Sequence, residues 1–415
     1  MPHLTTFMDD SFRFELDVAD QDKTRISCVI GPNGSGKSQL LRAIVDAVER
    51  KVPSGASTTA IARTRQLSDF SQVLAISNLV ADVFPSTRRL DRYRYLGVRQ
   101  ATNWTGTRAV ESLTVDSVLL CLRSPARVDA FRAALGIIGF SDFGVAADPE
   151  VKVPRGRPRT GAATSTKEIQ PIDQFGEHFL PVVRDGRAQL ATGDIDAWQR
   201  VMSDLDDGVR MFGVEPSDGI AFLRKRGELT ATLHFSQSGR TDDVGDLSAG
   251  QLLIVSLAAR LAAHVAADSL VLIDEPEIGL HPTWQALVAP LLREIVPPEL
   301  KSHVIVATHS PHVVVDADDV LVSGATWGKF ETFDESVGGR SVENILYRVF
   351  EARVVGNTEV EDDLTLVTSF LAGLSDTDLV EVRRASDRLR DVASSDTPVV
   401  NQVLEDVEQA LAGNT

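Results

Sequence analysis

The sequence predicts an α/β fold with an open sheet, because three short, largely apolar runs each end in a polar cluster. The runs are residues 24–30, 270–273 and 304–307, and the clusters that follow them contain glycines, carboxylates and a histidine. Uninterrupted apolar runs of this length are typical of strands buried on both faces. Since ligands of open α/β sheets bind at the carboxyl ends of the strands, the three clusters form the candidate site.

The first cluster, GPNGSGKS, fits the spacing G-x-x-x-x-G-K-[ST] and precedes a predicted helix at residues 39–51. Such a loop turns backbone N–H groups toward a phosphate at a helix N-terminus, and its glycines adopt angles that a side chain disfavours. We expect Lys37 to reach the β- and γ-phosphates and Ser38 to bind Mg²⁺. A glycine-rich turn without a ligand is the alternative. The predicted contacts in this loop are Gly31, Asn33, Gly34, Ser35, Gly36, Lys37 and Ser38.

The second and third clusters supply groups for metal binding and hydrolysis. Asp274 and Glu275 directly follow an apolar strand, and neighbouring residues of a strand point to opposite sides, so the two carboxylates have different roles. We expect Asp274 to serve the metal ion and Glu275 to polarise the attacking water. His309 follows the next apolar strand, where a neutral imidazole can hydrogen-bond a phosphate or hold the water. A helix cap for the carboxylates and a structural role for the histidine are the alternatives.

A fourth motif, LSAGQ at residues 247–251, directly precedes a long apolar helix. Ser248 is a favourable helix N-cap, and Gly250 permits close approach to the backbone. The helix end therefore offers free N–H groups to an anion. We include Ser248, Gly250 and Gln251 among the predicted nucleotide contacts.

Taken in chain order, GPNGSGKS, LSAGQ, the strand with DEP and ATHS resemble an ABC-type ATPase head, a class that includes transporter motors, chromosome-maintenance ATPases and OLD-type nucleases. A narrower resemblance is to the AAA_21-like ATPases of bacterial antiphage systems such as the Septu type. It is carried by the segments EPEIGLHP and THSP and, upstream of them, by AISNLVADVFP and YRYLG. The resemblance to an ABC-type head covers residues 8–335, and the narrower resemblance also includes SVENILYRVF. The resemblance to ABC-type heads implies ATP and Mg²⁺ as cofactors, with Lys37, Glu275 and His309 as catalytic residues.

The resemblance also implies partners. Ser248 and Gly250 match the signature that closes on ATP held by a second subunit, so two chains are expected to pack head to tail around two ATP molecules. A separately encoded effector nuclease, regulated during defence against phage, is the implied partner. Ala249 replaces a glycine of the transporter pattern, and the usual glutamine after the strand near the insertion is not identifiable, with Asn78 and Gln100 as candidates.

Two other functions remain open, namely a DNA-maintenance or repair head that binds DNA directly and the ATP-binding subunit of a transporter. The net charge of −17 excludes a surface that is basic throughout. Nucleic-acid contact would use the arginines and tyrosines of residues 84–99 or PRGRPR at residues 154–159, although solvated loops are the alternative for both. The longest apolar stretch, residues 252–267, is interrupted by charge and is too short for a membrane span. The two cysteines and the lack of a signal-peptide pattern lead us to expect a cytoplasmic protein.

The expected architecture is therefore an α/β P-loop NTPase with an ABC-type head, a helical insertion and a C-terminal helical segment. Four regions are predicted: residues 1–105, the N-terminal lobe with the phosphate loop; 106–215, a mainly helical insertion with a flexible loop at 145–174; 216–335, the C-terminal lobe; and 336–415, helices for dimerisation or partner docking. An alternating strand at residues 12–18 presents Phe12 and Phe14 either to the core or to a purine ring. Residues 219–235 are predicted to form a hairpin that turns at residues 226–228.

Overall fold

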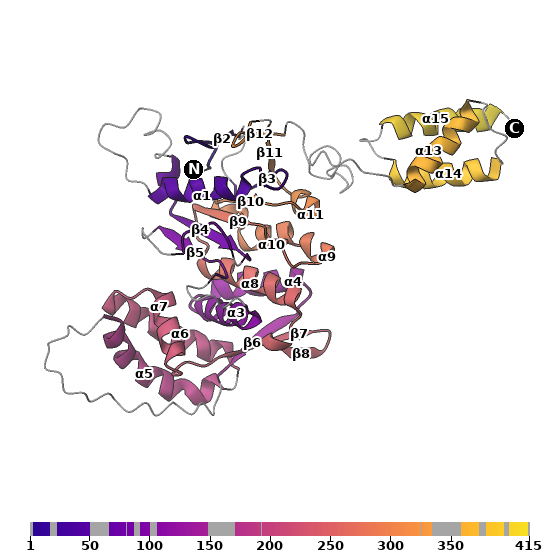
Figure 1. Ribbon diagram of the computed structural model, residues 1–415. Helices are drawn as coiled ribbons and strands as arrows, with labels where there is room; N and C mark the ends of the chain where they lie inside the picture. Colours follow the sequence, from indigo (N-terminus) through magenta and orange to yellow (C-terminus); the bar gives the residue numbers. More distant parts are fainter. Residues whose placement is uncertain are drawn as a thin grey trace. The chain divides into compact units, whose positions relative to one another are not determined.

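The computed structural model of the protein describes residues 3–16, 23–49, 66–79, 81–86, 92–99, 106–147, 171–191, 193–324, 326–333, 358–372, 379–393 and 398–413. The chain divides into two compact units, residues 1–336 and 337–415, which we describe separately (Figure 1).

A seven-stranded sheet lies at the centre of the first unit. Its order is β12-β11-β3-β10-β9-β4-β5, and every pairing is parallel except that of β12 with β11. The predicted α/β class is confirmed. The strands are β3 (Arg25–Ile30), β4 (Gln72–Ser77), β5 (Tyr93–Tyr95), β9 (Ser269–Asp274), β10 (His303–Ala307), β11 (Asp319–Ser323) and β12 (Phe330–Thr332).

The three apolar runs of the sequence form neighbouring central strands. In the register, Val306 of β10 lies opposite Cys28 of β3 and Ile273 of β9, and β9 and β10 are buried along their whole length. Strands covered on both faces need no alternation of apolar and polar residues, which explains the continuous runs. The carboxyl ends of β3, β9 and β10 therefore meet at one edge of the sheet.

Helices cover both faces of the sheet. Helix α1 (Lys37–Glu49) packs its apolar side against β3, β9 and β10, together with Phe7 of β1 (Thr6–Met8) and Phe14 of β2 (Arg13–Glu15). Helices α8 (Ala249–His264) and α10 (Val288–Ile295) lie on the opposite face (Figure 1). Phe14 is 3% exposed and stacks on Phe7, so it belongs to the core, as one of its two interpretations predicted.

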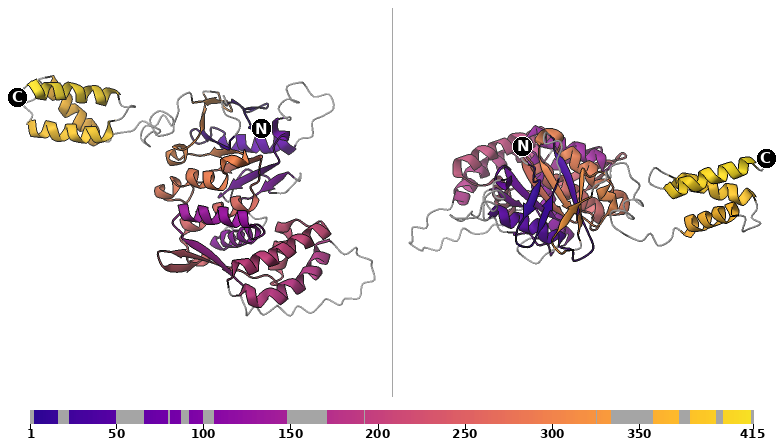
Figure 2. Two further views of the ribbon diagram at one scale, coloured as in Figure 1. Left: turned by 180° about the vertical axis from the view of Figure 1, so that it is seen from behind. Right: turned by 90° about the horizontal axis from the view of Figure 1, so that it is seen from above.

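The insertion is built from helices and a small antiparallel sheet. Its helices are α3 (Thr107–Cys121), α4 (Pro125–Ile137), α5 (Pro171–Leu190), α6 (Ile195–Phe212) and α7 (Pro216–Lys225), and its sheet is β6 (Asp142–Ala146), β7 (Thr232–Gln237) and β8 (Arg240–Asp243). Helix α3 packs on α8, whereas α5, α6 and α7 pack on one another, away from the seven-stranded sheet (Figures 1 and 2).

The hairpin predicted for residues 219–235 is wrong. Helix α7 occupies Pro216–Lys225, with proline at its first turn and with Ile220 and Leu223 buried at helical spacing. Residues 226–228 end this helix, and the hairpin lies further on, where β7 and β8 join through residues 238–239. A short continuous apolar run such as residues 220–223 is compatible with a strand or a helix, and the proline in the first turn favours the helix.

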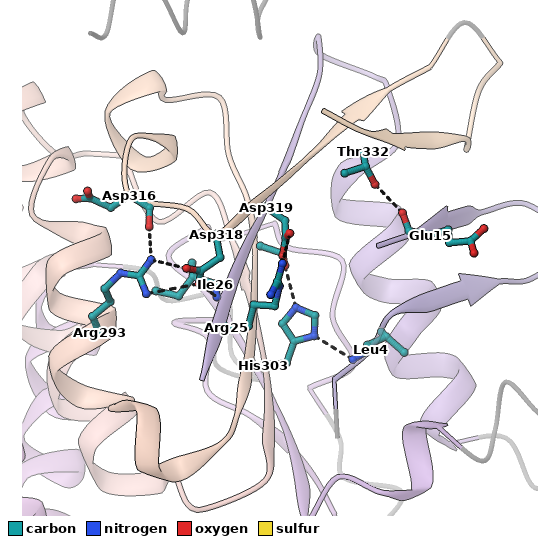
Figure 3. A network of polar contacts seen from close by, with 11 residues as sticks. Leu4, Glu15, Arg25, Ile26, Arg293, His303, Asp316, Asp318, Asp319 and Thr332 are labelled. Atoms are coloured by element: carbon teal, nitrogen blue, oxygen red, sulfur yellow. Dashed lines mark hydrogen bonds and ion pairs between the residues drawn. The ribbon is translucent and has the colours of Figure 1, made fainter. Parts of the chain in front are cut away.

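A buried polar network fixes the amino edge of the sheet (Figure 3). The backbone N–H of Leu4 donates to Nδ1 of His303 over 3.1 Å, so the ring proton lies on Nε2, which contacts the Ser27 hydroxyl at 2.9 Å. That hydroxyl donates to Asp319, which also accepts the guanidinium of Arg25. Burial lowers the pKa of His303 to about 3 and keeps the ring neutral. The network ties the N-terminal segment to β3, β10 and β11 at the edge opposite the carboxyl ends of the strands.

Short elements complete the first unit, and three helices form the second. The short elements are η1 (Val244–Asp246), α9 (Pro282–Gln285), η2 (Pro298–Leu300) and α11 (Pro311–Val314). The second unit contains α13 (Thr358–Leu371), α14 (Leu379–Val392) and α15 (Pro398–Gly413), which bury Val367, Val382, Leu389 and Val407 between them. The tail SVENILYRVF lies outside the described residues.

Candidate functional site

The glycine-rich loop joins the carboxyl end of β3 to the first turn of α1, the position required for phosphate binding. Gly34 and Gly36 have φ of +82° and +95°, angles that side chains rarely adopt. A Cβ at Gly36 would lie 3.0 Å from the Phe12 ring, whereas a Cβ at Gly34 would meet nothing within 4 Å. The buried hydroxyl of Ser35 has no hydrogen-bond partner in the described part of the chain. The loop thus has the conformation, the space and an unsatisfied donor that suit a phosphate.

Lys37 is the cation at the centre of the site. Its ammonium group donates to the carbonyl of Gly31 over 3.1 Å and to Nε2 of His309 over 2.6 Å, and it lies 3.9 Å from a carboxylate oxygen of Glu275. The residue is 5% exposed, and burial lowers its pKa although the nearby carboxylates act in the opposite sense. The two acceptors of its hydrogen bonds, the Gly31 carbonyl and the His309 ring, carry no negative charge, so the ammonium group remains able to attract an anion.

Ser38 and Asp274 form a pair of hard oxygen atoms beside Lys37. The Ser38 hydroxyl donates to Asp274 over 2.8 Å, and burial raises the pKa of Asp274 to about 6. Mg²⁺ is commonly held by one or two protein oxygens together with phosphates and water. The described residues contain no cluster of three or more His, Cys, Asp or Glu suited to a metal.

Glu275 follows β9 with a φ of +49°, which is uncommon for a residue with a side chain. Its carboxyl group lies 3.1 Å from Nε2 of His309. Burial, and then the neighbouring carboxyl of Glu277, raise the pKa of Glu275 to about 9. Burial and the adjacent Lys37 lower the pKa of His309, so its ring is neutral. The backbone conformation of Glu275 therefore places its protonated carboxyl group next to the neutral imidazole of His309.

Sequence reasoning assigned no role to Glu277. One of its carboxylate oxygens accepts the Thr308 hydroxyl over 2.7 Å and the backbone N–H of His309 over 2.6 Å, and the residue is 7% exposed. It therefore joins the segment after β9 to the segment after β10. The available signal was the second glutamate of EPE, two residues after Glu275, but the contact connects residues about thirty positions apart and no local pattern reveals it.

A cavity of about 660 Å³ lies where these groups meet. This volume is within the usual range for small-molecule sites. Its lining residues are Asn33, Gly34, Gly36, Lys37, Ser38, Gln39, Leu79, Val83, Glu275, Glu277, Ile278 and His309. Three of the predicted clusters therefore converge on one cavity.

The residues of LSAGQ do not line this cavity. Ser248 caps α8: its hydroxyl accepts the N–H of Gln251, and the Gln251 side chain accepts the N–H of Ser248 over 3.0 Å. Ser248 is exposed, and Gly250 and Gln251 are partly exposed. The motif presents a capped helix end to the outside of the unit rather than to its own phosphate loop.

Of the two candidates for the missing glutamine, Asn78 is described and Gln100 is not. Asn78 follows β4, and its side-chain oxygen accepts a hydrogen bond of 2.6 Å from the fully buried Arg260 of α8. Arg260 also donates to the carbonyl of Leu96 over 2.7 Å. The amide of Asn78 is thus used inside the fold, although the adjacent Leu79 reaches the cavity.

The described arginines of the basic run are occupied within the chain. Arg92 donates to the carbonyl of Ser68, Arg94 lies 3.2 Å from Glu215, and Arg99 lies 3.6 Å from Asp82. Arg88 and Arg89, as well as PRGRPR at residues 154–159, lie outside the described residues. For the described part of the run, these contacts favour a solvated loop whose arginines pair with groups of the protein over a nucleic-acid contact.

Residues 142–316 match the model of the AAA_21 family, described as "AAA domain, putative AbiEii toxin, Type IV TA system". The match covers less than half of the chain, and the matched segment is similar to AAA_21-type domains. The matched AAA_21 segment includes Asp274, Glu275 and His309, and the phosphate loop precedes it in the chain. The α/β fold with a phosphate loop between a central strand and a helix, as expected from the sequence, is confirmed by the strand order and by the position of the loop between β3 and α1. Within the described residues, no helix has the length and apolarity needed to cross a bilayer.

Similarity to individual proteins is limited. The Septu protein PtuA of Bacillus thuringiensis is 47% identical over 47 residues, which are 11% of this chain and 11% of that protein. The Smc head domain of Pyrococcus furiosus, bound to the C-terminal domain of ScpA, shares 13% identity over 79% of this chain and 92% of the other, with a TM-score of 0.30. The transporter subunit cbiO1 of Clostridium perfringens shares 13% identity over 79% of this chain and 84% of the other, with a TM-score of 0.28.

Proposed function

We propose that this chain binds ATP with Mg²⁺ and hydrolyses it to ADP and phosphate. The observation that carries the proposal is the convergence of Lys37, Ser38 and Glu275 on one cavity at the carboxyl edge of the sheet, where Ser38 is hydrogen-bonded to Asp274. The loop N–H groups and Lys37 would hold the phosphates, while Ser38 and Asp274 would hold the metal ion. His309 would contact the outermost phosphate.

Glu275 would act as the general base. A carboxyl group with a pKa of about 9 is protonated at neutral pH and accepts no proton from water. A bound Mg²⁺ ion supplies the positive charge that favours the ionised carboxylate. Ser38 and Asp274 would hold this ion, and Glu275, once ionised, would accept the proton of the attacking water.

The direct test is phosphate release from ATP by the purified protein. We expect release with Mg²⁺, and a fall to background both after chelation with EDTA and in the Lys37→Ala variant, which loses the central cation. Hydrolysis that continues in EDTA would contradict the metal role, and a Lys37→Ala variant that keeps the parental rate would contradict the assigned site.

In this proposal Glu277 is a positioning residue for His309. Because its carboxylate holds the backbone of His309, the Glu277→Ala change should release the histidine and lower kcat by about 10-fold or more, with little change in KM for ATP. The Glu277→Gln change keeps an acceptor oxygen for Thr308 and His309 and should retain most of kcat. Steady-state kinetics separate the two parameters. Equal losses in both variants, or a loss confined to KM, would count against this role.

We further propose that hydrolysis takes place in a dimer. Ser248, Gly250 and Gln251 lie outside the cavity of their own chain, on a helix end suited to a phosphate. A second copy, packed head to tail, would place this helix end against the nucleotide of the first. The three-helix unit at residues 358–413 would then serve dimerisation or partner docking.

The resemblance to Septu-type ATPases supports a role in antiphage defence in the bacterial cytoplasm, with a separately encoded effector nuclease as the regulated partner. The match of 47 residues to a Septu protein supports this part of the proposal. A neighbouring gene that encodes a permease, and none that encodes a nuclease, would contradict this part of the proposal.

A further inference from the structure

An exposed tryptophan lies against the phosphate loop. Trp327 belongs to the turn between β11 and β12 and is 54% exposed, although its indole N–H donates to the carbonyl of Gly34 over 3.3 Å. Single exposed apolar residues are common and need no explanation. Trp327 differs from such residues in its hydrogen bond to the loop, which connects the indole to the backbone that would hold the phosphates.

The indole is held in place from several sides. Its ring centroid lies 5.0 Å from that of Phe12, with 52° between the ring planes. A Cβ at Gly36 would lie 3.5 Å from the Cε2 and Nε1 atoms of Trp327, so the ring edge is in contact distance of the loop backbone. The exposed surface of the indole therefore lies beside the N-terminus of α1.

The turn that carries Trp327 is itself fixed. The N–H of Arg13 donates to the carbonyl of Gly328 over 2.9 Å, and the N–H of Lys329 donates to the carbonyl of Thr326 over 3.0 Å. Gly328 has a φ of +79°, and a Cβ there would lie 1.9 Å from the carbonyl oxygen of Ser11. Only glycine fits such a close approach. These contacts attach the turn beside Trp327 to the segment that precedes β2.

We propose that Trp327 is the platform on which the base of the bound nucleotide stacks. This inference rests on the proposed nucleotide site, because a base is joined through its ribose to the phosphates that the loop would hold. Phe12 and Phe14 are only 6% and 3% exposed, whereas Trp327 is 54% exposed.

The chemistry of the indole sets the specificity of this subsite. Its single N–H already serves Gly34, so it reads no hydrogen-bonding edge of the base. Stacking on an aromatic side chain depends on the area of the flat base and tolerates different edges. Trp327 therefore favours purine over pyrimidine nucleotides and discriminates weakly between adenine and guanine.

The experiment compares ATP with inorganic tripolyphosphate, which has the phosphates and lacks the base. Calorimetry with Mg²⁺ would measure both affinities for the full-length parent, Trp327→Ala and Trp327→Phe. We expect Trp327→Ala to weaken ATP binding about 10-fold or more and to leave tripolyphosphate binding unchanged. Trp327→Phe loses the same hydrogen bond to Gly34 but keeps an aromatic face, so it should retain most of the ATP affinity. Met211→Ala, at an exposed residue of α6, is the matched control.

The outcomes separate the two proposals. A parent protein that binds neither ligand overturns the nucleotide site itself. If the parent binds both, and Trp327→Ala either leaves ATP affinity intact or weakens both ligands equally, the base platform is overturned while the phosphate site stands. An equal loss of ATP affinity in Trp327→Phe and Trp327→Ala also overturns it, since the hydrogen bond to the loop would then account for the effect.

Discussion

Replacing Glu275 with glutamine is expected to stop hydrolysis while ATP stays bound. The amide has nearly the same shape as the carboxyl group and leaves the contacts of Lys37 and His309 sterically intact. It accepts no proton from water, so the contribution of general-base catalysis, about 10²- to 10⁴-fold, should be lost. The measurement is phosphate release together with the nucleotide retained after gel filtration.

The matched control is Glu294→Gln, at an exposed position of α10 on the same unit. It should hydrolyse at the parental rate and release its product. A Glu275→Gln variant that also hydrolyses at the parental rate would reject Glu275 as the base and redirect attention to His309 or Glu277.

The second large effect is the restoration of activity by mixing two inactive variants. Lys37→Ala removes the central cation of the phosphate site, and Ser248→Arg places a bulky side chain at the exposed cap of α8. Each variant alone should be inactive, because every composite site of a symmetric dimer would carry the defect. In a mixed dimer, one site pairs the intact loop of one chain with the intact signature of the other. Random pairing should restore roughly a quarter of the parental sites.

Phosphate release by the two variants, alone and mixed in equal amounts, measures this effect. Ser248→Arg alone at the parental rate would show that the helix end contacts no nucleotide. A mixture no more active than its components would show that loop and signature are not contributed by different chains. A far-ultraviolet circular dichroism spectrum equal to that of the parent would confirm that both variants are folded.

Much of the site could be predicted because its chemistry is encoded in short segments. The spacing of glycines around Lys37 determines the loop locally, and the burial of β9 and β10 determines the apolar runs that carry Glu275 and His309 to one edge. The topology then brings the segments together, since parallel neighbours align their carboxyl ends.

Two residues of the candidate site could not be predicted from such local patterns. Trp327 reaches Gly34 across 293 positions of the chain, and Glu277 reaches His309 across 32. Both contacts depend on how strand ends meet in space, for which the sequence has no periodic signal. The missed helix α7 has a different cause, because its short run of four apolar residues, 220–223, fits a strand and a helix about equally well.

The most direct test of the account is the mass of the Glu275→Gln variant in solution, measured by light scattering with Mg²⁺ and ATP. We predict a monomer without nucleotide and a dimer with ATP, reversed when Ser248→Arg is added to the same chain. A protein that binds ATP tightly and keeps the mass of one chain would contradict the composite site on which the account depends.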